Sequence, residues 1–199
     1  MQYKITIINS PPQQEFTPKW DILPIAKLTQ LGQGVKQGIF SQTAMCYRPR
    51  VGILVRMWAF EVNPAHGESR LALALAPNPQ RPEDYLSLSF EPDGTLFAYT
   101  VTDNTPPQPV DADIFSLNTF KGGDLQGEYW GAAFILPQQL LTGVFGANAY
   151  SAGESIYGNL LHSGMIDKDR VFTTLFPACT DTPDISRPDC FGAFEFIRF

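Results

Sequence analysis

Short segments in which large apolar side chains alternate with smaller or polar ones recur along this chain, with turn residues between them. In residues 85–90, two leucines and a phenylalanine alternate with a tyrosine, Ser87 and Ser89. A repeat of two residues is that of a β-strand with one buried face. Residues 91–94, Glu-Pro-Asp-Gly, supply a turn, and residues 95–102 return as the partner strand. The pattern predicts a β-hairpin in which Ser87 and Ser89 point away from the core.

Similar patterns predict further strands, at residues 4–8, 51–60, 71–76, 129–136, 144–150, 171–176 and 193–199. The segment 51–60 carries large side chains on both faces, which is typical of a central strand that is covered on both sides. Helix signals are few. Pro137 and Gly143 could begin and end one short helix, residues 24–31 give a weaker signal, and the polar segment 103–125 is expected to be a loop.

About eight strands with so little helix predict an all-β fold, an antiparallel β-sandwich of the jelly-roll type with one or two short helical turns. The 16 glycines and 17 prolines are consistent with many turns between strands. The length of 199 residues and the absence of a linker or repeat predict a single domain over residues 1–199. The last segment alternates large residues up to the end of the chain, so we expect it to close the sheet.

Charge and hydropathy exclude several kinds of partner. A net charge of −6 argues against nucleic acid, which needs a basic surface. No apolar run is long enough to cross a membrane or to act as a signal peptide. We therefore expect no membrane partner and a cytoplasmic location for the chain as it stands, or a secreted protein if a signal segment was removed.

The chain contains three cysteines, Cys46, Cys179 and Cys190, which cannot all pair with one another. No Cys-x-x-Cys spacing is present, so a zinc knuckle or a thioredoxin-like motif is not indicated. Three reduced thiols are the favoured prediction, and a single bridge between Cys179 and Cys190 is the alternative.

Residues that could carry catalysis or bind a metal are few. The only histidines, His66 and His162, lack metal-ligand spacing, and we expect structural roles for both. Residues 153–157 resemble a nucleophile elbow, but a tyrosine replaces its second glycine. Neither a paired-carboxylate strand nor a phosphate-binding loop is present.

No cofactor is expected to be required, although calcium is a candidate at either of two loop clusters. These clusters are Asp103, Asp111 and Asp113, and Asp181, Asp184 and Asp189.

Aromatic side chains are the remaining candidates for ligand binding, because flat rings stack on the C–H faces of sugars. Trp20, Trp58 and Trp130 are candidates for such stacking. Packing in the core is the favoured role for each of them, most strongly for Trp130, which begins an apolar strand.

Taken in order, these segments resemble the carbohydrate-binding module family 9-like domains. The matching pieces cover nearly the whole chain: Trp20, residues 51–60, 71–77, 85–94, 130–137, 146–150 and the closing Pro-x-x-Phe-Gly of residues 188–192. The resemblance implies a β-sandwich in which a terminal sugar lies between two aromatic side chains, with polar residues on an adjoining strand. The aromatic positions fall at Ile185 and near His66, the usual acidic position at Ala72, and the polar positions at Ser87 and Ser89.

The leading hypothesis is a non-catalytic carbohydrate-binding domain for a terminal sugar or oligosaccharide. We expect stacking and guanidinium contacts to provide affinity. The expected ligand contacts are Trp58, His66, Ser87, Ser89 and Arg187. Two alternatives are a module that binds another protein through this face and, less favoured, a glycoside-active enzyme. A concave face around Ser87 and Ser89 would favour sugar binding over the protein-interaction alternative.

Overall fold

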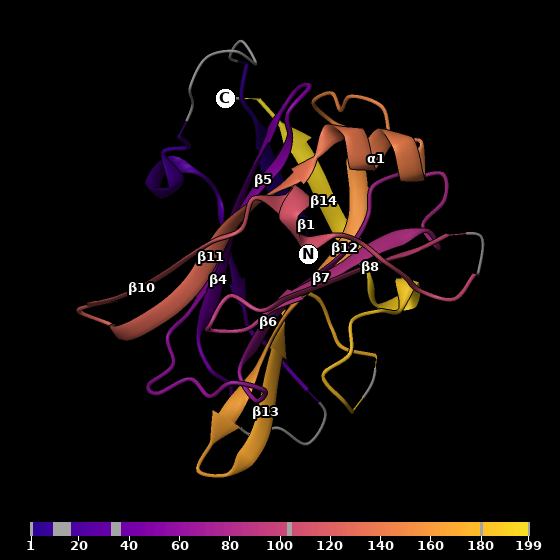
Figure 1. The fold of residues 1–199 in the computed structure, drawn as a ribbon. Coiled ribbons are helices and arrows are strands. Elements are labelled where there is room, and N and C mark those ends of the chain that lie inside the picture. The colour runs from indigo at the N-terminus through magenta and orange to yellow at the C-terminus, as the bar shows by residue number, and fades with distance from the viewer. Residues whose placement is uncertain (1, 10–16, 33–36, 103–104, 180, 199) are drawn as a thin grey trace.

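The structure is a computed structural model that describes residues 2–9, 17–32, 37–102, 105–179 and 181–198. It is an all-β fold with few helical turns, as predicted (Figure 1). The strands are β1 (Gln2–Ile7), β2 (Ile25–Leu28), β3 (Gln30–Leu31), β4 (Ser41–Arg48), β5 (Gly52–Ala59), β6 (Arg70–Ala76), β7 (Tyr85–Phe90), β8 (Leu96–Val101), β9 (Gln108–Pro109), β10 (Asn118–Asp124), β11 (Gly127–Pro137), β12 (Ser155–Ile166), β13 (Asp169–Thr174) and β14 (Gly192–Ile197). The α-helix is α1 (Gln138–Phe145), and 3-10 turns cover Trp20–Ile22, Ala112–Phe115 and Pro188–Cys190.

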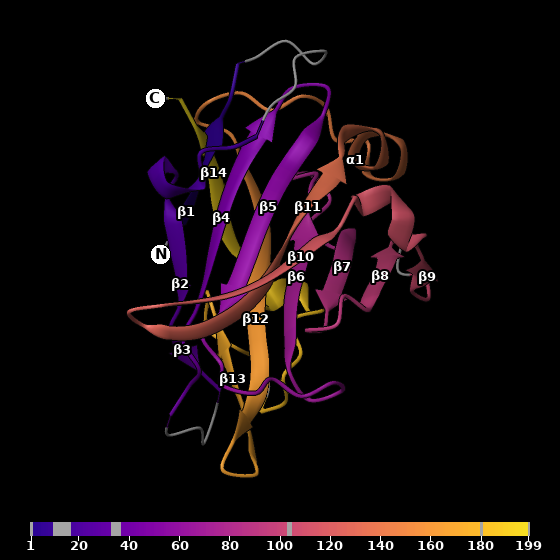
Figure 2. The ribbon, with the colours of Figure 1, turned by 60° about the vertical axis from the view of Figure 1, so that its left-hand side comes forward.

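The strands form one sheet that folds back on itself. Its order is β10-β11-β5-β4-β1-β14-β12-β6-β7-β8-β9, with β2 paired to β4, β13 paired to β12, and β3 paired to β13. In Figure 2 the long strands run along the long axis of the molecule, with α1 near one end and the β12–β13 hairpin at the other. The main hydrophobic core lies between the two halves of the sheet, because it combines residues of β4, β5 and β11 with residues of β6, β7 and β12.

The strands β1 and β14 lie beside each other in a parallel arrangement, with Tyr3 opposite Phe194 and Ile5 opposite Phe196. Strand β1 also pairs in parallel with β4 on its other side. The sheet is therefore mixed rather than purely antiparallel. Parallel neighbours need a long connection between them, and here almost the entire chain connects β1 to β14. Local sequence patterns detect hairpins but not such pairs.

Several segment predictions were wrong. Residues 24–31 form β2 and β3 instead of a helix, and the expected loop 103–125 contains β9, a 3-10 turn and the edge strand β10. Helix α1 begins after Pro137 as expected but continues to Phe145, so the strand predicted at 144–150 is absent. Two strands, β4 and β12, were not predicted. In β12 nearly every residue from Ile156 to Gly164 is buried, so its sequence shows no alternation.

Within the described residues, no helix combines the length and apolarity that a membrane crossing needs.

Candidate functional site

A pocket of about 510 Å³ lies on the outer face of β6, β7, β8 and β12. Its floor contains Ser87 and Ser89, which face outward because their neighbours in β7 are buried in the core. Ala72 of β6 lies opposite Ser89 in the sheet and also lines the pocket. Three small side chains on adjacent strands therefore leave a depression in this face of the sheet, as the sugar-binding hypothesis requires.

Two aromatic rings form one wall of the pocket. Phe97 and Tyr99 belong to β8, where they are the cross-strand partners of Ser89 and Ser87. Both are exposed, Phe97 at 37% and Tyr99 at 41% of their surfaces. Their spacing in the sequence puts them on one side of their strand, but they were not among the predicted contact residues. The register of the hairpin could have revealed them, because Phe97 and Tyr99 lie directly opposite Ser89 and Ser87.

The buried carboxylate of Glu91 contacts the charged residues at the rim of the pocket. Glu91 accepts hydrogen bonds from the Gly67 N–H at 2.9 Å and from Arg70 at 3.0 Å. Its Oε2 also lies 2.7 Å from Nδ1 of His66, which is itself 3.1 Å from Asp93. Burial acts to raise the pKa of Glu91, but the Gly67 N–H, Arg70 and His66 together hold it below its ordinary value. Glu91 is therefore an anion that fixes Arg70 at the pocket edge.

Both arginines that line the pocket are paired with carboxylates. Arg70 pairs with Glu91, and its guanidinium lies 5.3 Å from the centre of the Phe97 ring. Arg170 pairs with Glu68 at 2.9 Å. Their positive charges are largely neutralised locally, while their remaining N–H groups can still donate hydrogen bonds.

The opposite wall is a loop that includes residues 183–186. Ile185 is buried against a small cluster that includes Ala72, Tyr85 and Leu161. The Tyr85 hydroxyl donates a hydrogen bond to the Ser186 carbonyl at 2.8 Å. Ile185 therefore provides an apolar wall, at a position where the family resemblance implied an aromatic ring.

A disulfide between Cys179 and Cys190 closes this loop, so the prediction of three reduced thiols was wrong. The 3-10 turn Pro188–Cys190 helps to place the two Cα atoms 5.6 Å apart, within the range of a disulfide. That proximity depends on tertiary structure and cannot be deduced from spacing in the sequence. Cys46 is buried and unpaired.

The five predicted contact residues do not all meet at this pocket. Ser87 and Ser89 line it, and His66 lies on its rim next to Gly67. Arg187 follows the lining residue Ser186, but its guanidinium pairs with Asp189 at 2.8 Å. Trp58 lies elsewhere, on the outer face of β5, where it packs in a cluster around Leu54.

Two groups of described residues have the proximity needed to hold a metal ion. They are His66 with Glu91 and Asp93, and Asp189 with Cys179 and Cys190. The cysteines of the second group are joined in the disulfide and offer no thiolate. The first group already forms an ion-pair network with Arg70. Neither group is one of the two aspartate clusters that were predicted to hold calcium. Asp103, a member of one of those clusters, lies outside the described residues. Calcium binding therefore remains a prediction.

Comparison with known proteins gave matches only among solved structures. No family model and no curated protein matches the chain. A candidate carbohydrate-binding protein from Bacteroides uniformis aligns over 98% of both chains with a TM-score of 0.71 and 12% identity. A carbohydrate-binding module family 9 domain from Caldicellulosiruptor kristjanssonii, solved with cellotriose, aligns over all of this chain and 95% of its own, with a TM-score of 0.65 and 12% identity. The chain has the fold of a family 9 module.

A second structure of a Caldicellulosiruptor kristjanssonii family 9 module, in complex with glucose, gives a TM-score of 0.66 at 11% identity and covers 100% of this chain and 97% of that chain. The family 9 fold implied by the resemblance in the sequence is thus confirmed. The TM-scores and the coverage establish the shared fold, but at 11–12% identity the ligand has to be argued from the residues of this chain.

Proposed function

We propose that this chain is a non-catalytic carbohydrate-binding domain that binds a neutral terminal sugar or oligosaccharide in the pocket on β6, β7, β8 and β12. The main support is the convergence of positions that are far apart in the sequence. Ser87, Ser89 and Ile185 line one pocket and His66 lies at its rim. These are the positions at which the family resemblance implies a ligand.

The chemistry of the pocket suits a sugar. The rings of Phe97 and Tyr99 can stack on C–H groups, and the serine hydroxyls can both donate and accept hydrogen bonds. Because Arg70 and Arg170 are already paired with carboxylates, they suit the hydroxyls of a neutral sugar better than an anionic group. The pocket volume of about 510 Å³ is in the range of small-ligand sites. Its concave shape favours sugar binding over docking of a protein.

Isothermal titration calorimetry against glucose, cello-oligosaccharides and other neutral sugars would test this proposal. Calorimetry is preferable to tryptophan fluorescence, because no tryptophan lines the pocket. We expect saturable binding by the wild-type protein and at least about tenfold weaker binding by Tyr99→Ala, which loses a stacking surface. Trp58→Ala is the matched control and should bind as the wild type does.

The proposal fails if the folded wild-type protein binds no sugar in the panel. It also fails if Trp58→Ala loses binding while Tyr99→Ala, with an unchanged melting temperature, retains it. Repeating the titration with added calcium and with a chelator would separately test whether the ion is needed.

We also propose that the protein works in an oxidising compartment, outside the cytoplasm. The disulfide between Cys179 and Cys190 supports this location, since such bonds persist in secreted and periplasmic proteins and are rare in the cytosol. Fractionation of the native cells, with detection of the protein in the culture medium or the cytoplasm, would test it.

A further inference from the structure

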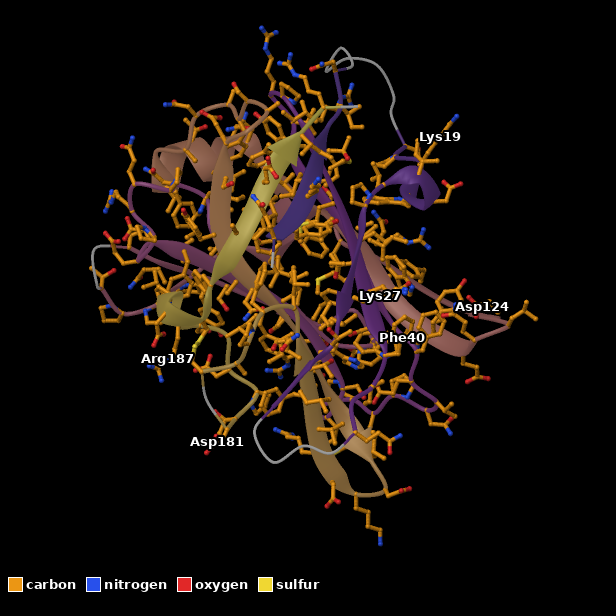
Figure 3. All side chains as sticks on the ribbon, turned by 180° about the vertical axis from the view of Figure 1, so that it is seen from behind. Lys19, Lys27, Phe40, Asp124, Asp181 and Arg187 are labelled. Carbon is orange, nitrogen blue, oxygen red and sulfur yellow. A yellow bond between two sulfur atoms is a disulfide. The ribbon has the colours of Figure 1, made fainter. Side chains whose placement is uncertain are left out.

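A row of aromatic and cationic side chains crosses the outer face of β2, β5, β10 and β11, on the half of the sheet that does not carry the pocket. We call this row the aromatic stripe, and it consists of Lys27, Phe40, Phe60, Tyr129, Phe120 and Arg56. Figure 3 places Lys27 and Phe40 beside each other on the flank that carries Asp124, while Arg187 lies on the opposite flank. The stripe is therefore separate from the proposed sugar pocket.

The four rings of the stripe contact one another in sequence. Phe40 stacks on Phe60 with ring centres 5.4 Å apart, and Phe60 meets the edge of Tyr129 at 5.7 Å. Tyr129 in turn contacts Phe120 at 6.3 Å. None of these rings is buried, and Phe40 is 36% exposed. Phe40 is exposed and the other three rings are partly exposed, and contiguous apolar side chains on a surface can mark an interaction site.

Two glycines on this face allow neighbouring groups to lie close to its backbone. A Cβ atom at Gly122 would lie 2.5 Å from the Tyr129 hydroxyl, so the tyrosine ring extends over the bare backbone of β10. A Cβ atom at Gly131 would lie 2.2 Å from the Met57 carbonyl oxygen and 2.8 Å from Trp58. The stripe is thus an open face that can take an extended ligand, and at Gly122 and Tyr129 it borders a hollow of about 580 Å³ that Glu61 and Glu128 also line.

Each end of the stripe carries a cation. The Arg56 guanidinium lies 4.6 Å from the Phe120 ring centre, and the Lys27 ammonium lies 5.9 Å from that of Phe40. Within the part of the chain that the structure describes, neither cation has a carboxylate within 4.0 Å. The pocket arginines differ, because each of them is paired with a glutamate.

Two cations that lie against aromatic rings and have no described carboxylate within 4.0 Å can pair with an anionic ligand. Stacking on a ring occupies the face of a guanidinium and leaves its in-plane N–H groups free to bind a carboxylate. We propose that the aromatic stripe is a second glycan-binding surface, which takes an extended polysaccharide whose sugars carry carboxylates. Sugar rings would stack on Phe60, Tyr129 and their neighbours, and uronate carboxylates would pair with Arg56 and Lys27.

Affinity gel electrophoresis in polygalacturonate, a polymer of one uronic acid, would test this proposal. We expect retardation of the wild-type protein at low salt and less retardation at high salt, because surface ion pairs are screened. Arg56→Gln should weaken binding about tenfold, and Phe40→Ala, at an exposed end of the stripe, should weaken it measurably. Both variants should keep wild-type affinity for neutral sugars in calorimetry, which separates this test from that of the pocket.

Two control variants test whether binding depends on the stripe itself rather than on any exposed positive charge or on the pocket. Lys168→Gln removes an exposed cation in the turn between β12 and β13, and Tyr99→Ala alters the pocket wall. Both should bind polygalacturonate as the wild type does. The proposal is overturned if the folded wild-type protein is not retarded, or if Arg56→Gln and Phe40→Ala bind as the wild type does. It is equally overturned if either control loses binding to the same extent as Arg56→Gln.

Sedimentation velocity tests the alternative that a second copy of this chain, rather than a polysaccharide, binds to the stripe. A concentration-dependent dimer that Phe40→Ala dissociates would overturn the proposal in favour of self-association. A wild-type monomer that is retarded by polygalacturonate supports it.

Discussion

Among single residues, the buried carboxylate of Glu61 links parts of the chain that are far apart in the sequence. It accepts hydrogen bonds from Ser69 Oγ at 2.6 Å and Trp130 Nε1 at 3.1 Å, and its Oε2 lies 3.4 Å from Nε2 of His162. Burial acts to raise the pKa of Glu61, but the hydrogen bonds from His162, Ser69 and Trp130 outweigh it and lower the pKa below its ordinary value of 4.5. Structural roles were expected for His162 and Trp130, and both side chains are buried here.

The Glu61 network makes stability depend on pH. Because the pKa of Glu61 is lower in the folded protein, its contribution is fully present above its ordinary value of 4.5 and is lost as the pH falls through the lowered pKa. We expect Glu61→Gln to reduce the free energy of unfolding at pH 7 by about 1–3 kcal/mol, since it leaves buried polar groups poorly paired. The variant should also lose less stability between pH 5 and pH 3 than the wild type does.

Urea denaturation across this pH range would measure both effects, with the exposed Glu128→Gln as control. Equal stability of Glu61→Gln and the wild type at pH 7, together with identical acid profiles, would show that the network contributes nothing to folding.

Among the elements, the β7–β8 hairpin and the loop between β13 and β14 differ in how far they could be predicted. The hairpin depends on neighbours in the chain, so alternation and the Glu-Pro-Asp-Gly turn were sufficient to place it. The loop depends on the bridge from Cys179 to Cys190 and on Tyr85, which lies 101 residues away from Ser186 in sequence. No local pattern records such contacts.

The disulfide should stabilise both the fold and the pocket wall. We expect reduction to lower the free energy of unfolding by about 2–3 kcal/mol, because the bridge restricts the unfolded chain. Sugar binding should weaken as well, since the loop that carries Ile185 is held at both ends by the bridge. Urea denaturation and calorimetry with and without dithiothreitol would measure these effects, and Cys179→Ser, which cannot form the bridge, should not respond to the reductant. Three free thiols in the unfolded, unreduced wild-type protein would contradict this expectation.

For the whole molecule, β14 joins the two halves of the sheet, because it lies between β1 and β12. Its buried Phe196 stacks on Tyr150 with ring centres 4.2 Å apart and contacts Tyr47 at 5.5 Å. This final segment was expected to close the sheet, and the strand that it forms lies in the middle of the strand order rather than at an edge.

Replacing Phe196 with alanine should therefore destabilise the entire fold. We expect a loss of about 3–5 kcal/mol, from lost burial and the cavity left between the halves of the sheet. Chemical denaturation would measure the loss, and Phe97→Ala, at an exposed ring of β8, is the control that should change stability by less than about 1 kcal/mol. A loss below about 1 kcal/mol for Phe196→Ala would contradict the position of β14 in the core.

The sequence by itself determined the all-β class, the β7–β8 hairpin and the outward direction of Ser87 and Ser89, because each follows from residues that are neighbours in the chain. Only the tertiary structure decided which of these surfaces meet. It brought Phe97, Tyr99 and the loop around Ile185 to the two serines, placed Trp58 away from them, and joined the chain ends in parallel strands. The physical reason is that strand order and loop packing arise from contacts between distant segments, and a repeat of two residues says which face is buried but not what covers it.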